Sequence, residues 1–146
     1  MPVNKKKGLA FFRPDLESGT SIVHVNQGVS AGFPSPALDF MENRIDLNKA
    51  LSDNPLATFF IRVEGNSMID AGIENQDVLV VDRSIEPANK KIAICFIDGE
   101  FTVKRLKLEK DGLWLMPENK KYSPIKVGDE NQFLIWGIVT YVIKKL

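Results

Sequence analysis

The chain has 146 residues, of which 44% are hydrophobic and 26% are charged, as in one ordinary globular domain with a short appendage. Its 19 basic and 19 acidic residues give a formal net charge of zero. A protein that binds DNA on its own normally has an excess of basic residues on one face, so this balance argues against that class and favours protein partners. The single cysteine, Cys95, excludes an internal disulfide and fits a reducing cytoplasm.

The first residues resemble the start of a secretion signal, because three lysines precede an apolar stretch. That stretch, residues 8–12, ends at Arg13 after only five residues, which is too short for a signal core. Nothing in the chain approaches the roughly 18 apolar residues that a membrane helix needs. We therefore expect a cytoplasmic protein that makes no contact with a membrane.

Residues 1–31 are polar and show little apolar periodicity, so we expect a loose N-terminal arm in which residues 21–26 favour a short strand. The composition changes at the two prolines within residues 32–36, which favour an extended chain. We place the boundary between the arm, residues 1–31, and one domain, residues 32–146, at this point. Residues 37–42 then favour a short helical turn.

Asp46 is a favourable N-cap for a short helix over residues 47–51, which Asn54-Pro55 would end. From residue 57 onward the pattern is typical of β-structure. The dipeptide Asp98-Gly99 between two apolar runs is a strong hairpin signal. Strands are predicted over residues 58–63, 77–82, 91–97, 101–108, 112–117 and 132–143, the second of them buried on both faces. The fold class is mainly β, with one or two short helices.

Lys104 lies within the predicted strand over residues 101–108, on the same face as Leu106 and Leu108. An apolar environment disfavours an ammonium group, so it lowers the pKa of a lysine from about 10.4. A lysine that is neutral near physiological pH can act as a general base. The alternative is that the amine reaches water along its methylene stem, and the position of Lys104 alone favours this alternative.

Ser67 follows Gly65 and Asn66 at the exit of the predicted strand over residues 58–63. Such a turn can present a hydroxyl group and direct backbone N–H groups to one point, as an oxyanion site requires. The alternative is a plain turn, since all three residue types are common in turns. A serine nucleophile needs a base, and the only histidine, His24, lies in the polar arm. Acyl chemistry in this chain would therefore depend on a lysine base.

Two segments resemble the LexA/UmuD family of self-cleaving proteins. Residues 65–82 are similar to the nucleophile segment of that family, and residues 98–106 are similar to its general-base segment. The separation of 37 residues between Ser67 and Lys104 also suits the family. Ala31-Gly32 resembles the Ala-Gly bond that members cut, with an apolar residue, Val29, at the expected place before it. Residues 32–37, 43–48 and 122–125 resemble the UmuD branch in particular.

The resemblance implies a strongly curved, mostly antiparallel domain of the LexA/signal-peptidase type and a specific chemistry. Ser67 would attack the carbonyl of Ala31, while Lys104 would take the hydroxyl proton and pass it to the leaving amine of Gly32. The backbone N–H groups of Asn66 and Ser67 would hold the oxyanion. No metal or cofactor is implied. Because a tethered substrate has a high effective concentration, a charged lysine or an undocked arm must keep the site idle.

The resemblance also implies partners. A RecA filament on single-stranded DNA would stimulate the cut in the SOS response, and residues 32–146 would join a UmuC-like Y-family DNA polymerase as a homodimer in translesion synthesis. A LexA-type repressor is disfavoured, because about 31 residues cannot hold a helix-turn-helix domain. A signal-peptidase relative would need a membrane anchor. A non-catalytic, dimeric interaction module of the same fold stays open, as does the role of residues 133–143 as core strand or dimer face.

Overall fold

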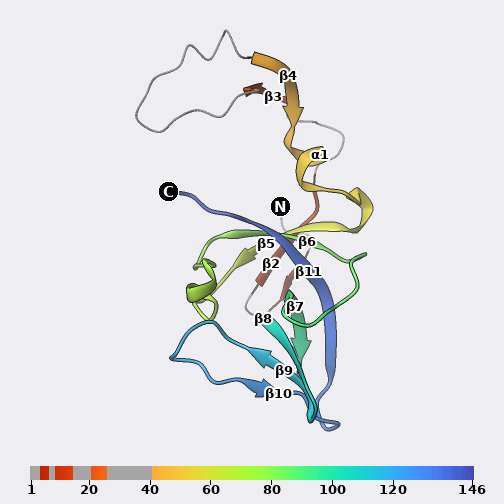
Figure 1. Ribbon diagram of the computed structural model, residues 1–146, viewed down its shortest axis with the longest axis vertical. Coiled ribbons are helices and arrows are strands. Elements are labelled where there is room, and N and C mark those ends of the chain that lie inside the picture. Colours follow the sequence, from red (N-terminus) through yellow and green to blue (C-terminus); the bar gives the residue numbers. More distant parts are fainter. Residues whose placement is uncertain (1–3, 7–8, 15–20, 26–40) are drawn as a thin grey trace.

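The computed structural model describes residues 4–6, 9–14, 21–25 and 41–146. These residues build one nine-stranded antiparallel sheet that curls around its own interior, in the order β1-β2-β5-β6-β11-β7-β8-β9-β10 (Figure 1). The prediction of a mainly β, curved, mostly antiparallel domain is confirmed. The strands are β1 Asn4–Lys6, β2 Leu9–Phe12, β5 Thr58–Val63, β6 Val78–Asp82, β7 Ile92–Ile97, β8 Glu100–Glu109, β9 Gly112–Met116, β10 Ile125–Lys126 and β11 Phe133–Ile143.

A second, two-stranded sheet joins β3 (Ser21–Val25) to β4 (Met41–Asp46), and helix α1 (Leu47–Leu51) follows it directly. The predicted strand near residue 21 is confirmed. Asp46 caps α1 as predicted, because its Oδ1 accepts a hydrogen bond of 3.0 Å from the backbone N–H of Asn48. The helical turn predicted over residues 37–42 is wrong at its end, where Met41 pairs with Val25 in a strand; residues 37–40 lie outside the described part.

The other predicted elements are present with shifts of a residue or two at their ends. Asp98 and Gly99 join β7 to β8 and have φ angles of 47° and 87°, the left-handed conformation that a two-residue hairpin turn needs. Two short 3-10 helices cover Pro55–Ala57 and Ile69–Ala71. Strand β10 was not predicted, because two residues are too few to show a period. No helix in the described ranges is long and apolar enough to span a membrane.

The N-terminal segment differs from the loose arm that its composition predicts. Strand β2 pairs in antiparallel register with β5, from Leu9 opposite Val63 to Phe12 opposite Phe60. Leu9 and Phe11 are 2% and 4% exposed, so the short apolar run is a core strand. Composition missed it because alternate burial of only two side chains gives no periodicity that stands out within 31 polar residues.

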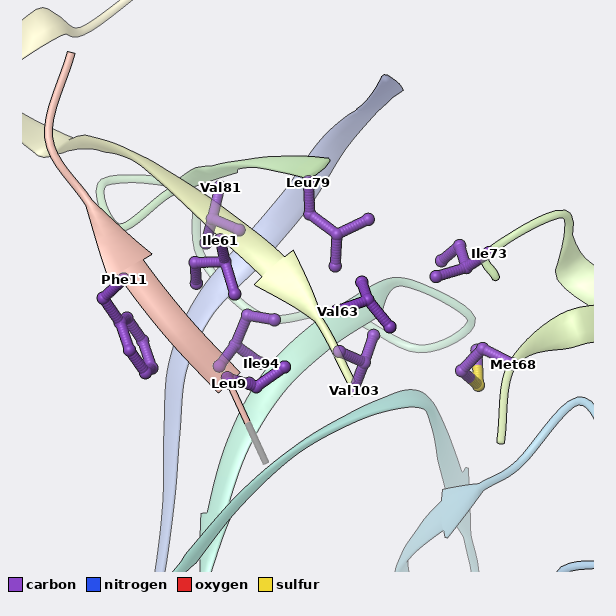
Figure 2. Packing of buried hydrophobic residues seen from close by; sticks show 10 residues of the cluster. All are labelled: Leu9, Phe11, Ile61, Val63, Met68, Ile73, Leu79, Val81, Ile94 and Val103. Atoms are coloured by element: carbon purple, nitrogen blue, oxygen red, sulfur yellow. The ribbon is translucent and has the colours of Figure 1, made fainter. Parts of the chain in front are cut away.

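The interior of the curled sheet is one apolar cluster to which five strands contribute. Figure 2 shows these side chains directed toward a common centre. The cluster comprises Leu9, Phe11, Ile61, Val63, Met68, Ile73, Leu79, Val81, Ile94 and Val103. A second cluster contains Ala93, Cys95, Leu106, Leu115 and Ile138. Strand β7 supplies Ile94 to the first and its two sequence neighbours to the second, because side chains alternate along a strand.

Strand β11 connects the two halves of the sheet by pairing with both β6 and β7. Its middle is a core strand, since Ile138 is 1% exposed. Its pairing register shifts next to Gly137, where an added Cβ would lie 2.6 Å from Val81 Cγ1. The glycine therefore lets two strands approach closely at a bulge. The last residues, Tyr141–Ile143, are between 39% and 49% exposed.

The burial of Phe11 predicts that the N-terminal strand contributes to stability. Phe11→Ala should lower the free energy of unfolding by about 3 kcal/mol, because it removes a buried ring and leaves a cavity. Leu56→Ala is the control, since Leu56 is 95% exposed, and should change it by less than about 0.5 kcal/mol. Urea denaturation of both variants measures the difference. Equal, small effects would show that β2 is not packed on the core.

Candidate active site

The curl of the sheet brings Ser67 and Lys104 together. Ser67 lies in the loop that follows β5, and Lys104 lies in the middle of β8. Strands β6, β11 and β7 separate these two strands along the sheet. Val63 at the end of β5 and Val103 beside the lysine nevertheless share the same buried cluster (Figure 2). As a result Lys104 Nζ lies 3.0 Å from Ser67 Oγ, within hydrogen-bond distance.

The amine of Lys104 is held inside the protein. The residue is 6% exposed, and its Nζ also donates to Thr102 Oγ1 at 2.6 Å and to the Val103 carbonyl at 3.1 Å. Burial lowers the pKa of Lys104 below its ordinary value, because removal from water disfavours the charged form. The alternative that the amine reaches water along its stem is therefore wrong. The predicted apolar face holds for Leu106, which is 2% exposed, but not for Leu108, which is 58% exposed.

Cys95 lies close enough to this amine for the two groups to interact electrostatically. It is fully buried on β7, opposite Thr102 in the neighbouring strand. Burial raises the pKa of the Cys95 thiol to about 12, and the nearby Lys104 only partly opposes this shift. The reactive form of cysteine is the thiolate, so the thiol is an inert neighbour at neutral pH.

A cavity of about 190 Å³ opens next to the two side chains. Asn66 and Ser67 both line it, which is necessary for their backbone N–H groups to reach a substrate oxygen. The remaining lining residues come from β2, the end of β5, the loop on both sides of Ser67, β8 and the segment after β9. They are Leu9, Val63, Glu64, Gly65, Met68, Ile73, Glu100, Phe101, Thr102, Val103, Lys104 and Tyr122.

Backbone hydrogen bonds from the segment after β9 hold the loop that carries Ser67. The N–H of Glu118 donates to the carbonyl of Ser67 at 2.8 Å, and the carbonyl of Glu118 accepts from the N–H of Asp70 at 2.7 Å. The side chain of Asn119 donates to the carbonyl of Asn66 at 2.8 Å. Sequence reasoning missed Glu118 and Asn119, because their partners lie about 50 residues away and no local pattern links the segments.

An ion pair links the same segment to the strand of the lysine. Arg105 Nε lies 2.6 Å from Glu118 Oε1, and Arg105 Nη1 donates to the Lys90 carbonyl at 2.7 Å. Both side chains of the pair are about one third exposed, so the pair contributes little to stability. Its importance is geometric, because Arg105 is adjacent to Lys104 and Glu118 contacts Ser67 through its backbone.

Gly65 shapes the other end of the loop. Its φ of 94° lies in the left-handed region that favours glycine, and its N–H donates to Asn75 Oδ1 at 2.9 Å. The N–H of Asn75 in turn donates to Asn66 Oδ1 at 3.3 Å. The two asparagines thus fasten the turn before Ser67 to the chain that leads into β6.

The predicted cleavage bond, Ala31-Gly32, lies outside the described residues. In sequence it falls between Val25 at the end of β3 and Met41 at the start of β4, which pair with each other. Within the described ranges, no group of three or more His, Cys, Asp and Glu side chains is placed to hold a metal ion.

The model of the protein family described as "Peptidase S24-like" matches residues 24–140 of this chain. The matched range includes both Ser67 and Lys104. The chain belongs to the peptidase S24-like family. This S24 protein is 46% identical to "Protein ImpA" of Salmonella typhimurium over 121 residues, which cover 79% of this chain and 78% of ImpA. It is 43% identical to "Protein MucA" of Escherichia coli over 129 residues, which cover 85% of this chain and 88% of MucA.

It is also 39% identical to the "LexA repressor" of Ectopseudomonas mendocina over 135 residues, which cover 92% of this chain and 66% of that repressor. ImpA and MucA are UmuD-like proteins. The predicted membership of the LexA/UmuD-type family, and of its UmuD branch, is therefore confirmed.

The buried lysine predicts a pH-dependent contribution to the stability of this S24 protein. In the unfolded chain a lysine keeps its proton up to about pH 10.4, whereas folded Lys104 releases it at lower pH. Between these values the unfolded state binds more protons, so the contribution of Lys104 to stability rises with pH. The free energy of unfolding of the native chain, minus that of Lys104→Met, should therefore increase from pH 7 to about pH 10. A difference that is the same at both pH values would contradict the lowered pKa.

The bond from Asn119 predicts a local effect on the Ser67 loop. Asn119→Ala should cost about 1 kcal/mol of stability and speed amide exchange over residues 65–70. Asn131→Ala is the matched control, because Asn131 also fastens a loop through its side chain, by a 2.6 Å bond to Asp98 Oδ2, away from the cavity. It should leave exchange at residues 65–70 unchanged. Equal amide exchange rates at residues 65–70 in both variants would show that Asn119 does not stabilise the Ser67 loop.

Proposed function

We propose that the chain is a self-cleaving serine endopeptidase of the LexA/UmuD type, in which Ser67 and Lys104 cut the Ala31–Gly32 bond. The observation that carries the proposal is the contact between the two side chains. A lysine amine that is almost completely buried lies 3.0 Å from a serine hydroxyl group at the edge of a cavity. Family membership supports the same conclusion independently.

The chemistry begins with the loss of the proton from Lys104. A charged ammonium group can only donate hydrogen bonds, whereas the neutral amine has a lone pair that accepts the proton of Ser67. The serine oxygen then attacks the carbonyl carbon of Ala31 and forms a tetrahedral intermediate. The backbone N–H groups of Asn66 and Ser67 stabilise the negative oxygen of this intermediate.

The intermediate collapses when the bond between Ala31 and Gly32 breaks. The ammonium group of Lys104 returns its proton to the departing amine of Gly32, so the lysine acts as base and then as acid. Residue 31 is left as an ester on Ser67, which a water molecule hydrolyses with the neutral lysine again as base. The second step frees the serine and completes the cut.

The proposed mechanism predicts a slow reaction whenever Lys104 carries its proton. Thr102 Oγ1 and the Val103 carbonyl accept hydrogen bonds from Nζ beside Ser67, as they can from the charged ammonium group. While the amine is protonated the site is idle. Activation then requires either a higher pH or a partner that favours the neutral amine and a docked substrate bond.

In the cell, the proposed partner that stimulates the cut is a RecA filament on single-stranded DNA, in the SOS response. The product, residues 32–146, would act in the cytoplasm as a homodimer and as accessory subunit of a UmuC-like, Y-family translesion polymerase. These partners rest on the resemblance to UmuD-type proteins and on the identity with ImpA and MucA.

Mass spectrometry of the intact protein tests the proposed cut. Incubation from pH 7 to about 10.5 should yield a fragment that begins at Gly32, at a rate that rises up to tenfold per pH unit below the pKa of Lys104. Ser67→Ala and Lys104→Ala should each slow the cut by on the order of 10³-fold or more. Lys107→Ala, which changes a half-exposed lysine on the same strand, should leave the rate unchanged.

If no fragment forms at any pH, the incubation is repeated with RecA, single-stranded DNA and a nucleotide. The absence of a cut under these conditions too would overturn the peptidase proposal and leave a non-catalytic interaction module. A cut that persists in Ser67→Ala would assign the nucleophile to another residue.

A further inference from the structure

We propose that Lys144, directly after β11, is a positioning residue for the candidate active site. It holds the turn over residues 74–77, and Asn75 of that turn fixes the backbone that precedes Ser67. This role rests on the proposed function, because that backbone leads into the N–H groups that would hold the oxyanion. Lys144 itself would not touch the substrate.

The amine of Lys144 binds both ends of the turn. Its Nζ lies 2.5 Å from Asp77 Oδ2 and 2.8 Å from Glu74 Oε2. The side chain of Asp77 is 7% exposed, whereas that of Lys144 is 32% exposed. A carboxylate that is withdrawn from water needs a partner inside the protein, and Lys144 supplies the opposite charge. The pair with Asp77 is therefore partly buried and differs from an ordinary surface ion pair.

A bulge in β11 brings the lysine to this carboxylate. The C-terminal half of β11 pairs with β6 (Figure 1), and the pairing shifts by one residue within residues 139–141. Beyond the bulge the ladder ends with Ile143 opposite Val78. The next residues along the two antiparallel chains are Lys144 and Asp77. Without the extra residue Ile143 would lie opposite Asp77, and an apolar side chain would face the carboxylate.

The turn that Lys144 holds has a conformation that needs support. Gln76 has a φ of 74°, in the left-handed region that is uncommon for a residue with a side chain. Asp77 Oδ2 accepts a hydrogen bond of 2.8 Å from the N–H of Glu74, and so closes the turn. The N–H of Gln76 donates to the Val63 carbonyl, and the N–H of Val63 donates to the Asp77 carbonyl, both at 2.9 Å. The turn is thus fastened to the end of β5 and to Lys144.

Asn75 connects this turn to the loop that carries Ser67. Its Oδ1 accepts a hydrogen bond of 2.9 Å from the N–H of Gly65, and its own N–H donates to Asn66 Oδ1 at 3.3 Å. A displacement of residues 74–77 therefore moves the two residues before Ser67. A displacement of about 1 Å in a reacting geometry can cost on the order of 10²-fold in rate. A lysine outside the cavity can therefore affect the cut through this short series of contacts.

The ion pair stays charged under the conditions in which the cut would be measured. Hydrogen bonds to Asp77 and to Glu74 raise the pKa of Lys144 above its ordinary value. Burial shifts the pKa of Lys104 in the opposite direction. An increase in pH therefore removes the proton of Lys104 first and leaves that of Lys144.

Cleavage rates of lysine variants test the role of Lys144. Lys144→Met should slow the cut about tenfold, because it displaces the loop. The slowing should be the same from pH 7 to about pH 10, since Lys144 does not act on the pKa of Lys104. Lys144→Arg keeps the charge and should cut within about twofold of the native rate. Lys145→Met, which changes the neighbouring exposed lysine, is the matched control and should also stay within about twofold.

A double variant shows whether Lys144 acts through Asp77. Asp77→Asn keeps an oxygen that can accept from the N–H of Glu74, but it removes the charge that Lys144→Met would leave unpaired. The combination Asp77→Asn/Lys144→Met should therefore fold, and it should cut no more slowly than the slower single variant. Slowing that equals the product of the two single effects would overturn the role. A native rate in Lys144→Met, or an equal loss in Lys144→Arg, would overturn it too.

Amide exchange measures the positioning without any cut, in chains that all carry Ser67→Ala. Lys144→Met should speed the exchange of the N–H groups of Gly65 and Asn75 by about fivefold or more. The N–H of Gln132, which donates at 3.0 Å to the carboxylate of the turn between β7 and β8, is the internal control and should exchange as before.

Unchanged exchange at Gly65 and Asn75 would overturn the inference. Equal acceleration at Gln132 would also overturn it, because it would show that Lys144 contributes only to general stability. These chains cannot cut themselves, so their exchange rates decide the role of Lys144 even if the native chain never cuts. Conversely, unchanged exchange would leave the proposed peptidase function untouched.

Discussion

The burial of one lysine amine is the constraint on which the rest of the structure depends. Water no longer surrounds Lys104 Nζ, so the amine must find its hydrogen-bond partners inside the protein, and Ser67 Oγ, Thr102 Oγ1 and the Val103 carbonyl supply them. Two of these acceptors come from β8 itself. The third must be brought from the far side of a curled sheet, which couples the geometry of the whole domain to a single contact.

Two sets of contacts fix the distance between Ser67 Oγ and Lys104 Nζ in the curled sheet. The loop after β5 is fastened on one side by Asn75 and on the other by Glu118 and Asn119, so its backbone has little freedom near Ser67. The ion pair between Glu118 and Arg105 then connects the segment that holds this loop to β8, the strand that carries Lys104. Ser67 and Lys104 are thus positioned relative to each other through a third segment, the one after β9, and not only through the core.

Strand β2 lies within the predicted N-terminal arm and yet packs as part of the sheet and its core. Leu9 and Phe11 complete the same apolar cluster that supports Val63 and Val103, and Leu9 also borders the cavity. A region that self-cleavage would remove thus covers apolar surface while it is attached.

The sequence by itself determined the class of fold, the strands from residue 58 onward, the hairpin at Asp98-Gly99 and the two residues of the candidate site, because period, turn chemistry and family motifs are local in the chain. Only the tertiary structure decided that Lys104 points inward, that Asn119 supports the Ser67 loop and that Leu9 belongs to the core. The physical reason is that each of these facts depends on a contact between segments about 40 or more residues apart. Such contacts arise from the curl of the sheet, and no local pattern encodes them.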